Sequence, residues 1–152
     1  TLAVIIVLLV RQGEHTYAIP LNSIERLINL SADEIKGLLN DQAIIYNNAS
    51  IPLLSLARLF SLPSRSTMRM SIVVLRKDNA LLGLIVDAPL STEEIITQPL
   101  NSVIKASKFF SGTALLGSGE MILILDVEQF FIFTLGSRKE VESNGMSSDS
   151  LK

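Results

Sequence analysis

Short apolar runs separated by turn residues recur along the chain, and most of them pair into hairpins. Gly and Asn accept the positive φ angles that tight turns demand, so a run–turn–run pattern with these residues predicts a β-hairpin. Four such turns are present, at Gln12-Gly13-Glu14, Asn47-Asn48, Lys77-Asp78-Asn79 and Gly117-Ser118-Gly119. Many short strands at fairly even spacing predict small β-barrels or a sandwich.

The segments between these hairpins carry a different pattern. SIERLINLSADEIKGLL (residues 23–39) is predicted to be helical or irregular, with Ser31 and Glu34 forming a capping box. LARLFSLP (56–63) is predicted to form one helical turn that ends at Pro63, and STEEIITQPLNSVIKASKFF (91–110) to cross over between subdomains. FFIFTLG (130–136) suits either one more strand or a terminal helix.

The two halves of the chain resemble each other. SIPLLSLARLF (50–60) overlays MILILDVEQFF (121–131) without a gap, and YAIPLNSIERLI (17–28) is similar to GLIVDAPLSTEEII (83–96). An internal sequence repeat with a period of about 70 residues predicts two related β subdomains. We expect a mainly all-β domain over residues 1–135, and a disordered tail or linker over 136–152, where Ser, Gly and mixed charge replace the apolar residues.

Composition and charge remove several classes of function. The chain has no Cys and a net charge of −2, so disulfides and thiolate metal sites are excluded and nucleic-acid binding is disfavoured. The apolar run at residues 2–10 is about half the ~20 residues of a spanning helix, and it lacks the basic flank of a signal peptide. We expect a soluble, cytoplasmic piece of a longer chain, without membrane insertion.

The sequence evidence for a catalytic or ligand-binding site is weak at each candidate position. GTALLGSGEM (112–121) has the glycine spacing of a phosphate loop, but Ser118 and Gly119 stand where Lys and Ser or Thr belong. Asp87 and Asp126 each end an apolar strand, and a paired-carboxylate hydrolase is the alternative to two structural turn residues. His15, the single histidine, has no partner for triad or zinc chemistry. We expect no catalytic residues, no metal and no cofactor.

Four stretches resemble, in order, the CheW-like family: TLAVIIVLLVRQGEHTYAIPLNSIERLI, IIYNNASIPLLSLARLFSL, VVLRKDNALLGLIVDAPLSTEEIITQPL and KFFSGTALLGSGEMILILDV. The TLA opening, the pair Pro99-Leu100 and the FSG-x-A-x-LG-x-G motif look most like the C-terminal regulatory domain of the chemotaxis histidine kinase CheA. The resemblance implies two intertwined five-stranded β-barrels of the SH3 type. It also implies a non-catalytic scaffold that docks the kinase to a CheW-type adaptor, to the cytoplasmic tips of chemoreceptors and to other domains of the parent kinase. A free-standing CheW-type adaptor is the alternative.

The resemblance also implies the partner-binding residues. A Glu after the Y-x-I-P strand matches Glu25, and Ile24, Leu27 and Ile28 would form the apolar surface around it. The family usually has Arg-Gly before the second IP strand, where this chain has Asn47-Asn48; Asn47 is therefore a candidate contact without the charge of Arg. Ser55 stands where the family often has Asp.

Overall fold

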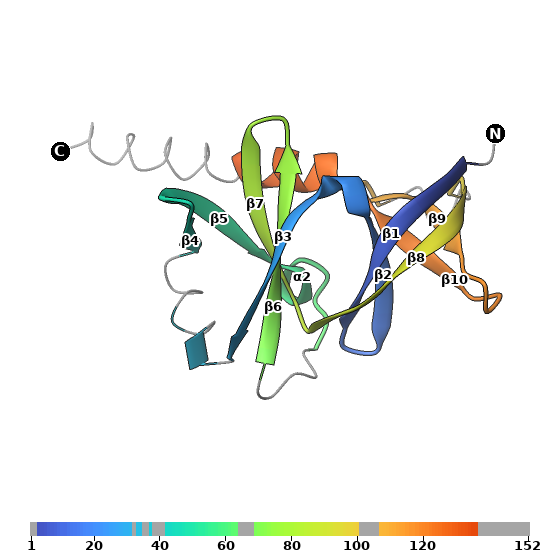
Figure 1. Cartoon of the computed structure of the whole chain (residues 1–152), viewed down its shortest axis with the longest axis horizontal. Coiled ribbons are helices and arrows are strands. Elements are labelled where there is room, and N and C mark those ends of the chain that lie inside the picture. Colours follow the sequence, from blue (N-terminus) through green and yellow to red (C-terminus); the bar gives the residue numbers. More distant parts are fainter. Residues whose placement is uncertain are drawn as a thin grey trace.

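The computed structural model describes residues 3–31, 33–34, 37, 42–63, 69–100 and 107–136. Ten strands of these residues fall into two sheets that lie side by side along the long axis of the molecule, with β1 and β8 at one end and β4 and β5 at the other (Figure 1). The strands are β1 (Ala3–Gln12), β2 (His15–Pro20), β3 (Ile24–Ser31), β4 (Ala43–Tyr46), β5 (Ala49–Ser55), β6 (Arg69–Lys77), β7 (Ala80–Val86), β8 (Ala88–Gln98), β9 (Phe110–Leu115) and β10 (Met121–Leu125). The short helices η1 (Leu21–Ser23) and α2 (Leu56–Leu59) and a helix over residues 127–136 complete the described elements.

The first sheet is a closed barrel in the order β1-β2-β10-β9-β8, and the second has the order β3-β6-β7-β5-β4. The chain enters the second sheet after β2 and returns to the barrel at β8, so the barrel combines both ends of the described chain. The predicted all-β architecture of two five-stranded units is confirmed. Closure is seen only for the first unit, because β3 and β4 are the two edges of the second sheet among the described strands.

Three apolar layers hold this arrangement together. The inside of the barrel is filled by residues such as Val7, Ile95 and Ile122. The inner face of the second sheet is covered by another cluster, which includes Ile44 and Ile72. The third and largest layer lies between the two sheets and is named here the shared core: Leu8, Val10, Tyr17, Ile19, Leu56, Val73, Leu75, Leu82, Leu84, Val86, Leu125, Val127, Phe130 and Phe131.

The shared core explains why two apolar runs are continuous rather than alternating. Successive side chains of a strand point to opposite faces. On β1, Val7 and Leu9 point into the barrel while Leu8 and Val10 point into the shared core, and all four are buried. β6 repeats this pattern between the shared core and the inner face of the second sheet. The N-terminal run is therefore a strand that is buried on both faces from Val7 to Val10. No helix in the described part of the chain is long and apolar enough to cross a membrane.

The segments that are similar in sequence also have the same structural arrangement. β5 pairs in parallel with β7 and leads into α2, while β10 pairs in parallel with β2 and leads into the helix over 127–136. Ser55 and Asp126, which align in the sequence overlay, each lie directly before the helix that follows the parallel strand. The Ser55 hydroxyl accepts from the Arg58 N–H at 3.3 Å, and an Asp126 carboxylate oxygen accepts from the Gln129 N–H at 3.4 Å. Each is a helix N-cap, which satisfies a donor that the first turn leaves unpaired.

The predictions for single elements are mostly confirmed. All four hairpins form, with positive φ at Gly13, Asn47, Asn48, Asp78 and Gly119. α2 is the predicted helical turn, and Ser31 and Glu34 exchange the two hydrogen bonds of a capping box, both at 3.2 Å.

Two predictions for the connecting segments are wrong. Residues 24–31 form strand β3, which pairs along β6, rather than a helical or irregular segment. Residues 91–98 belong to strand β8, which pairs with β1, rather than to a crossover segment between the sheets. In both segments the cross-strand partner decides the structure. The helix over 127–136 settles the open choice for FFIFTLG, and residues 137–152 of the predicted tail lie outside the described residues.

Replacing Leu75 with Ala tests the shared core. Leu75 is fully buried on β6, and we expect Leu75→Ala to lower the free energy of unfolding by about 2–5 kcal/mol through lost burial and a cavity. Ile45→Ala on β4 is the control, because Ile45 is 74% exposed and its truncation should change stability by at most about 0.5 kcal/mol. Urea unfolding measures both. Equal costs would contradict a tightly packed layer between the sheets.

Replacing Asp126 tests its capping role. Asp126→Ala should lower the free energy of unfolding by about 1 kcal/mol, because the Gln129 N–H loses its acceptor and the helix loses an N-terminal negative charge. Asp126→Asn keeps a capping oxygen and should retain most of the stability. Thermal and urea unfolding compare the two variants. A loss as large for Asn as for Ala would argue against the cap.

Candidate functional site

Glu25 and the three apolar residues implied to surround it, Ile24, Leu27 and Ile28, all lie on β3, an edge strand of the second sheet. A bulge interrupts the pairing of β3 with β6 at Glu25, because Ile24 is opposite Leu75 while Arg26 is opposite Val74. A bulge re-aims side chains and disrupts the ladder locally. It places Ile24 and Leu27 opposite shared-core residues of β6, and Ile28 opposite Ile72 on the inner face.

Glu25 is already oriented by a neighbour within the molecule. A guanidinium nitrogen of Arg76 lies 2.8 Å from a Glu25 carboxylate oxygen, with the two side chains 53% and 28% exposed. An exposed pair of this kind adds little stability, but it limits the positions that the carboxylate adopts. Glu25 therefore presents at the surface a carboxylate that is already paired with the Arg76 guanidinium.

The apolar residues around Glu25 differ in what they expose. Leu27 is 38% exposed, whereas Ile24 is half-buried against the shared core and Ile28 is half-buried against the inner layer of the second sheet. Leu27 is the member of this set that offers a free apolar surface. The other two also support the fold.

Asn47 lies on a different part of the second sheet. It forms the exposed turn between β4 and β5, with φ of 50° at Asn47 and 63° at Asn48. β4 and β3 are opposite edges of the sheet, with β6, β7 and β5 between them. The strand order therefore brings Glu25 and Leu27 together but places Asn47 apart from them.

The closed barrel carries an apolar surface that the sequence analysis missed. On its outer face Val4 lies opposite Ile96, Ile96 opposite Leu115, and Leu115 opposite Met121, so a row of four side chains crosses β1, β8, β9 and β10. Val4 is 61% exposed, Met121 47% and Ile96 40%, and Leu115 is half-buried. These four residues are named here the barrel row.

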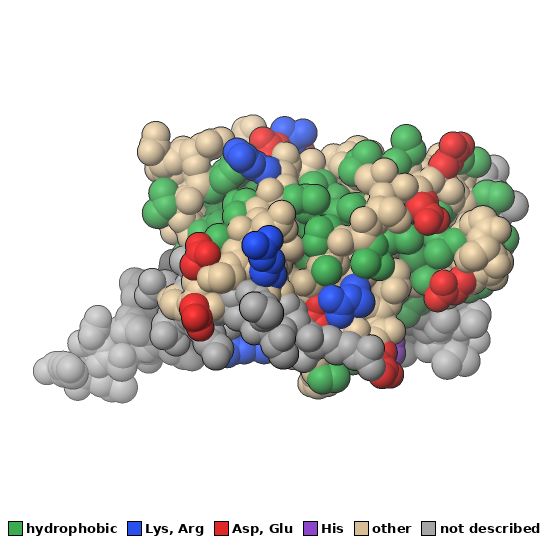
Figure 2. Space-filling model, turned by 60° about the horizontal axis from the view of Figure 1, so that its bottom comes forward, with side chains coloured by type: hydrophobic (Ala, Val, Ile, Leu, Met, Phe, Trp, Pro, Cys, Tyr) green, Lys and Arg blue, Asp and Glu red, His purple; other side chains and the backbone are tan. Residues whose placement is uncertain are grey.

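The barrel row has another exposed apolar residue beside it, with acidic groups at its border, such as Glu94 opposite Ile6. Ile6, two residues along β1 from Val4, is also exposed, at 54%. Figure 2 shows hydrophobic side chains spread over one face of the molecule, including the end occupied by the barrel, with charged groups scattered among them. Monomeric proteins rarely leave contiguous apolar patches exposed without a use. The row was missed because residues 91–98 were assigned to a crossover, which hid the place of Ile96 in the sheet.

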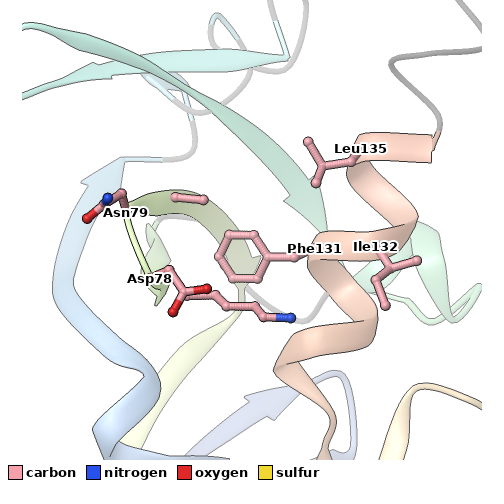
Figure 3. A pocket seen from close by; sticks show the side chains of 7 residues that line it. Asp78, Asn79, Phe131, Ile132 and Leu135 are labelled. Carbon is pink, nitrogen blue, oxygen red and sulfur yellow. The ribbon is translucent and has the colours of Figure 1, made fainter.

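A shallow hollow of about 540 Å3 lies between the β6–β7 turn and the helix over 127–136. The Phe131 ring points from the helix toward the turn, and Asp78 and Asn79 lie on the far side (Figure 3). Lys77, which also lines the hollow, contacts Glu128 at 2.8 Å. This contact holds the pKa of the Glu128 carboxyl below its usual range. The hollow suits an apolar side chain of a partner better than acid–base chemistry.

Polar groups elsewhere have structural roles. The Asp87 side chain is fully buried and its oxygens accept from the Gly13 N–H and the Gln12 side chain, while Asp126 caps a helix. A hydrolytic carboxylate pair has to face one open cleft, so the geometry favours the structural reading of both acids. Burial raises the pKa of the Tyr17 hydroxyl, and Tyr17 stacks with Phe110 in the aromatic part of the shared core. The described residues contain no group of three or more His, Cys, Asp or Glu placed to hold a metal ion.

Most of the chain is similar in sequence to part of two longer bacterial proteins. The chain is 31% identical over 144 residues to the chemotaxis protein CheA of Treponema pallidum, covering 93% of this chain and 18% of that protein. It is 30% identical over 129 residues to the sensor histidine kinase CheAY of Helicobacter pylori, covering 84% and 16%. The chain thus spans less than a fifth of the length of these relatives.

A solved structure and a family model agree with this match. The crystal structure of the scaffolding protein TtCheW from Thermoanaerobacter tengcongensis superposes with a TM-score of 0.66 and 18% sequence identity, covering 82% of this chain and 90% of that one. The model of the CheW-like domain matches residues 7–132, which include both sheets except residues 3–6 of β1, and the first part of the last helix. The chain belongs to the CheW-like domain family.

Proposed function

We propose that this chain is the regulatory scaffold domain of a CheA-type histidine kinase, and that it docks the kinase to a CheW-type adaptor and to the cytoplasmic tips of chemoreceptors. The observation that carries the proposal is the barrel row, an exposed apolar line across four strands of a closed barrel. Barrel closure leaves no strand edge there for pairing, so its side chains have to make the contact.

The edge strand β3 supplies a second docking surface in this proposal. Leu27 offers apolar area, and Glu25 offers a carboxylate that Arg76 holds in position. Central apolar contacts contribute most of the affinity in a typical interface, while oriented charges select the partner. The barrel row would then hold the adaptor, and the Glu25 region would discriminate among adaptor or receptor surfaces. Asn47 would add a polar contact at the opposite edge.

A free-standing CheW-type adaptor is the second candidate. The matched structure of the same fold is titled a CheW scaffolding protein, whereas the curated relatives with about 30% identity are CheA proteins. The TLA opening and the FSG-x-A-x-LG-x-G motif favour the kinase domain. The coding sequence upstream of Thr1 distinguishes the two: dimerisation helices and an ATPase domain indicate the kinase, and a start codon within a few residues indicates the adaptor.

The proposed domain acts by binding, and phosphoryl transfer would belong to other parts of the parent kinase. We place it in the cytoplasm, near a membrane only through receptor arrays. Titration of the purified domain with the CheW-type adaptor of the same organism should give a dissociation constant in the micromolar range. This corresponds to a binding free energy of about −8 kcal/mol. Absence of heat at high micromolar concentrations of a folded domain would count against the proposal.

Val4→Glu tests the barrel row. A charge within an apolar contact loses its hydration, so we expect the affinity for the adaptor to fall about tenfold or more. Ile45→Glu is the matched control, since Ile45 is also an exposed aliphatic residue on a strand but lies on β4 of the second sheet. Calorimetric titration measures both. Equal affinities for the two variants would show that the row is not the contact.

Glu25→Arg tests the second surface. The change reverses the charge next to Arg76 and should weaken binding, while the free energy of unfolding changes by no more than about 1 kcal/mol because the pair is exposed. Glu128→Arg is the control, because it breaks another exposed ion pair of the same 2.8 Å length, with Lys77. If Glu25→Arg binds as well as Glu128→Arg, Glu25 is not part of the docking surface.

A further inference from the structure

Three segments that are distant in sequence meet at a buried polar cluster between the barrel and the second sheet. Asp87 is the single residue between β7 of the second sheet and β8 of the barrel. Gln12 ends β1 of the barrel and Gly13 begins the turn to β2, while Pro63 lies between α2 and β6 of the second unit. The cluster thus lies where the chain passes from one unit to the other.

Hydrogen bonds connect the three segments. One Asp87 carboxylate oxygen accepts from the Gly13 N–H at 2.9 Å, and the other accepts from the Gln12 side-chain amide at 3.2 Å. The same amide nitrogen donates to the Pro63 carbonyl oxygen at 3.3 Å. The Asp87 N–H donates to the Arg11 carbonyl oxygen at 3.1 Å, and the Arg11 guanidinium lies 3.7 Å from the carboxylate.

The cluster is closely packed as well as bonded. Gln12 is fully buried, and Asp87 is 3% exposed. Gly13 has a φ of +62°, and a Cβ at this position would lie 2.8 Å from the Pro63 carbonyl oxygen. Any other residue at position 13 would push the β1–β2 turn away from Pro63. The turn therefore fits against the second unit in one position.

The shared core and this cluster restrain the two units in different ways. Apolar burial is non-directional, so a layer of Leu, Val and Ile resists separation of the sheets more than it resists their sliding or rotation. Hydrogen bonds to a buried carboxylate depend on distance and angle, and a buried charge that loses them carries a large desolvation cost. The polar cluster is therefore the part that selects one orientation.

We propose that Asp87 is a positioning residue, which fixes the orientation of the barrel relative to the second sheet by tying the β1–β2 turn, through Gln12, to Pro63. With the barrel row on one unit and the Glu25 region on the other, this orientation sets the angle at which a partner meets both surfaces. The consequence for docking rests on the proposed function, whereas the positioning itself does not.

Distances between two labels test the positioning directly. The chain has no Cys, so Ser118→Cys in the exposed β9–β10 turn and Ser50→Cys at an exposed position of β5 give one spin label on each unit. We expect a single narrow distance distribution in the otherwise unchanged domain. Asp87→Asn should broaden or shift it, because the amide group cannot accept from both Gly13 and Gln12 while Gln12 keeps its bond to Pro63.

Two further variants secure the interpretation. Gln12→Met removes the bonds to Pro63 and to Asp87 with a side chain of similar size, and should broaden the distribution even if Asp87→Asn does not fold. Asp126→Asn is the matched control, since it makes the same chemical change at a helix cap and should leave the distribution narrow. An unchanged distribution in folded Gln12→Met and Asp87→Asn domains would overturn the proposal.

Affinity for the adaptor, measured on the same proteins, separates this proposal from the proposed function. A broadened distribution together with an affinity reduced about tenfold supports both the positioning and its consequence for docking. A broadened distribution with unchanged affinity would overturn the consequence for docking. If the unchanged domain binds no adaptor, the proposed function fails while the distance measurement still decides the role of Asp87.

Discussion

Burial of β1 from Val7 to Val10 and of β6 from Ser71 to Leu75 on both faces is the constraint on which the rest of the structure depends. Each strand contributes one set of side chains to the interior of its own sheet and the alternate set to the shared core. Neither sheet could hide both faces of these strands alone, so the two units form one folded body rather than two independent domains. The crossing of the chain after β2 and again at β8 follows from this, because each crossing keeps the strands of both halves in contact with the common layer.

The same constraint decides where the molecule can bind a partner. The faces turned toward the shared core are occupied, and closure of the barrel removes its strand edges. What remains is the outer face of the barrel, the edge strands β3 and β4, and the turns. The barrel row and Leu27 lie on these remaining surfaces, whereas Ile24 and Ile28, on the same strand as Leu27, are partly used by the interior. Binding capacity in this fold is therefore limited by how much apolar surface the core leaves over.

Local signals in the sequence were sufficient for elements that depend on local chemistry. The positive φ angles of Asn47 and Asn48, the capping box of Ser31 and Glu34 and the turn at Gly119 each arise from a few neighbouring residues. Strands β3 and β8 could not be recognised in this way, because their alternation is interrupted by a bulge at Glu25 and by the adjacent acids Glu93 and Glu94. Their pairing with β6 and β1 is a long-range effect. The barrel row was hidden for the same reason, since it exists only through the registers of four strands. Glu25 was found through family resemblance, and nothing in its local pattern marks it.

The polar cluster at Asp87 adds to this division between local and long-range information. A single Asp after an apolar strand reads in the sequence as a turn residue, and in the structure it does accept a backbone N–H, but from a turn more than seventy positions away. Asp126, which also follows an apolar strand, accepts from a residue three positions along. The two acids therefore look alike in sequence while one organises a helix and the other joins two units. The difference arises from their places in the fold, because Asp87 lies at the crossing from β7 to β8 whereas Asp126 lies between β10 and the helix over 127–136.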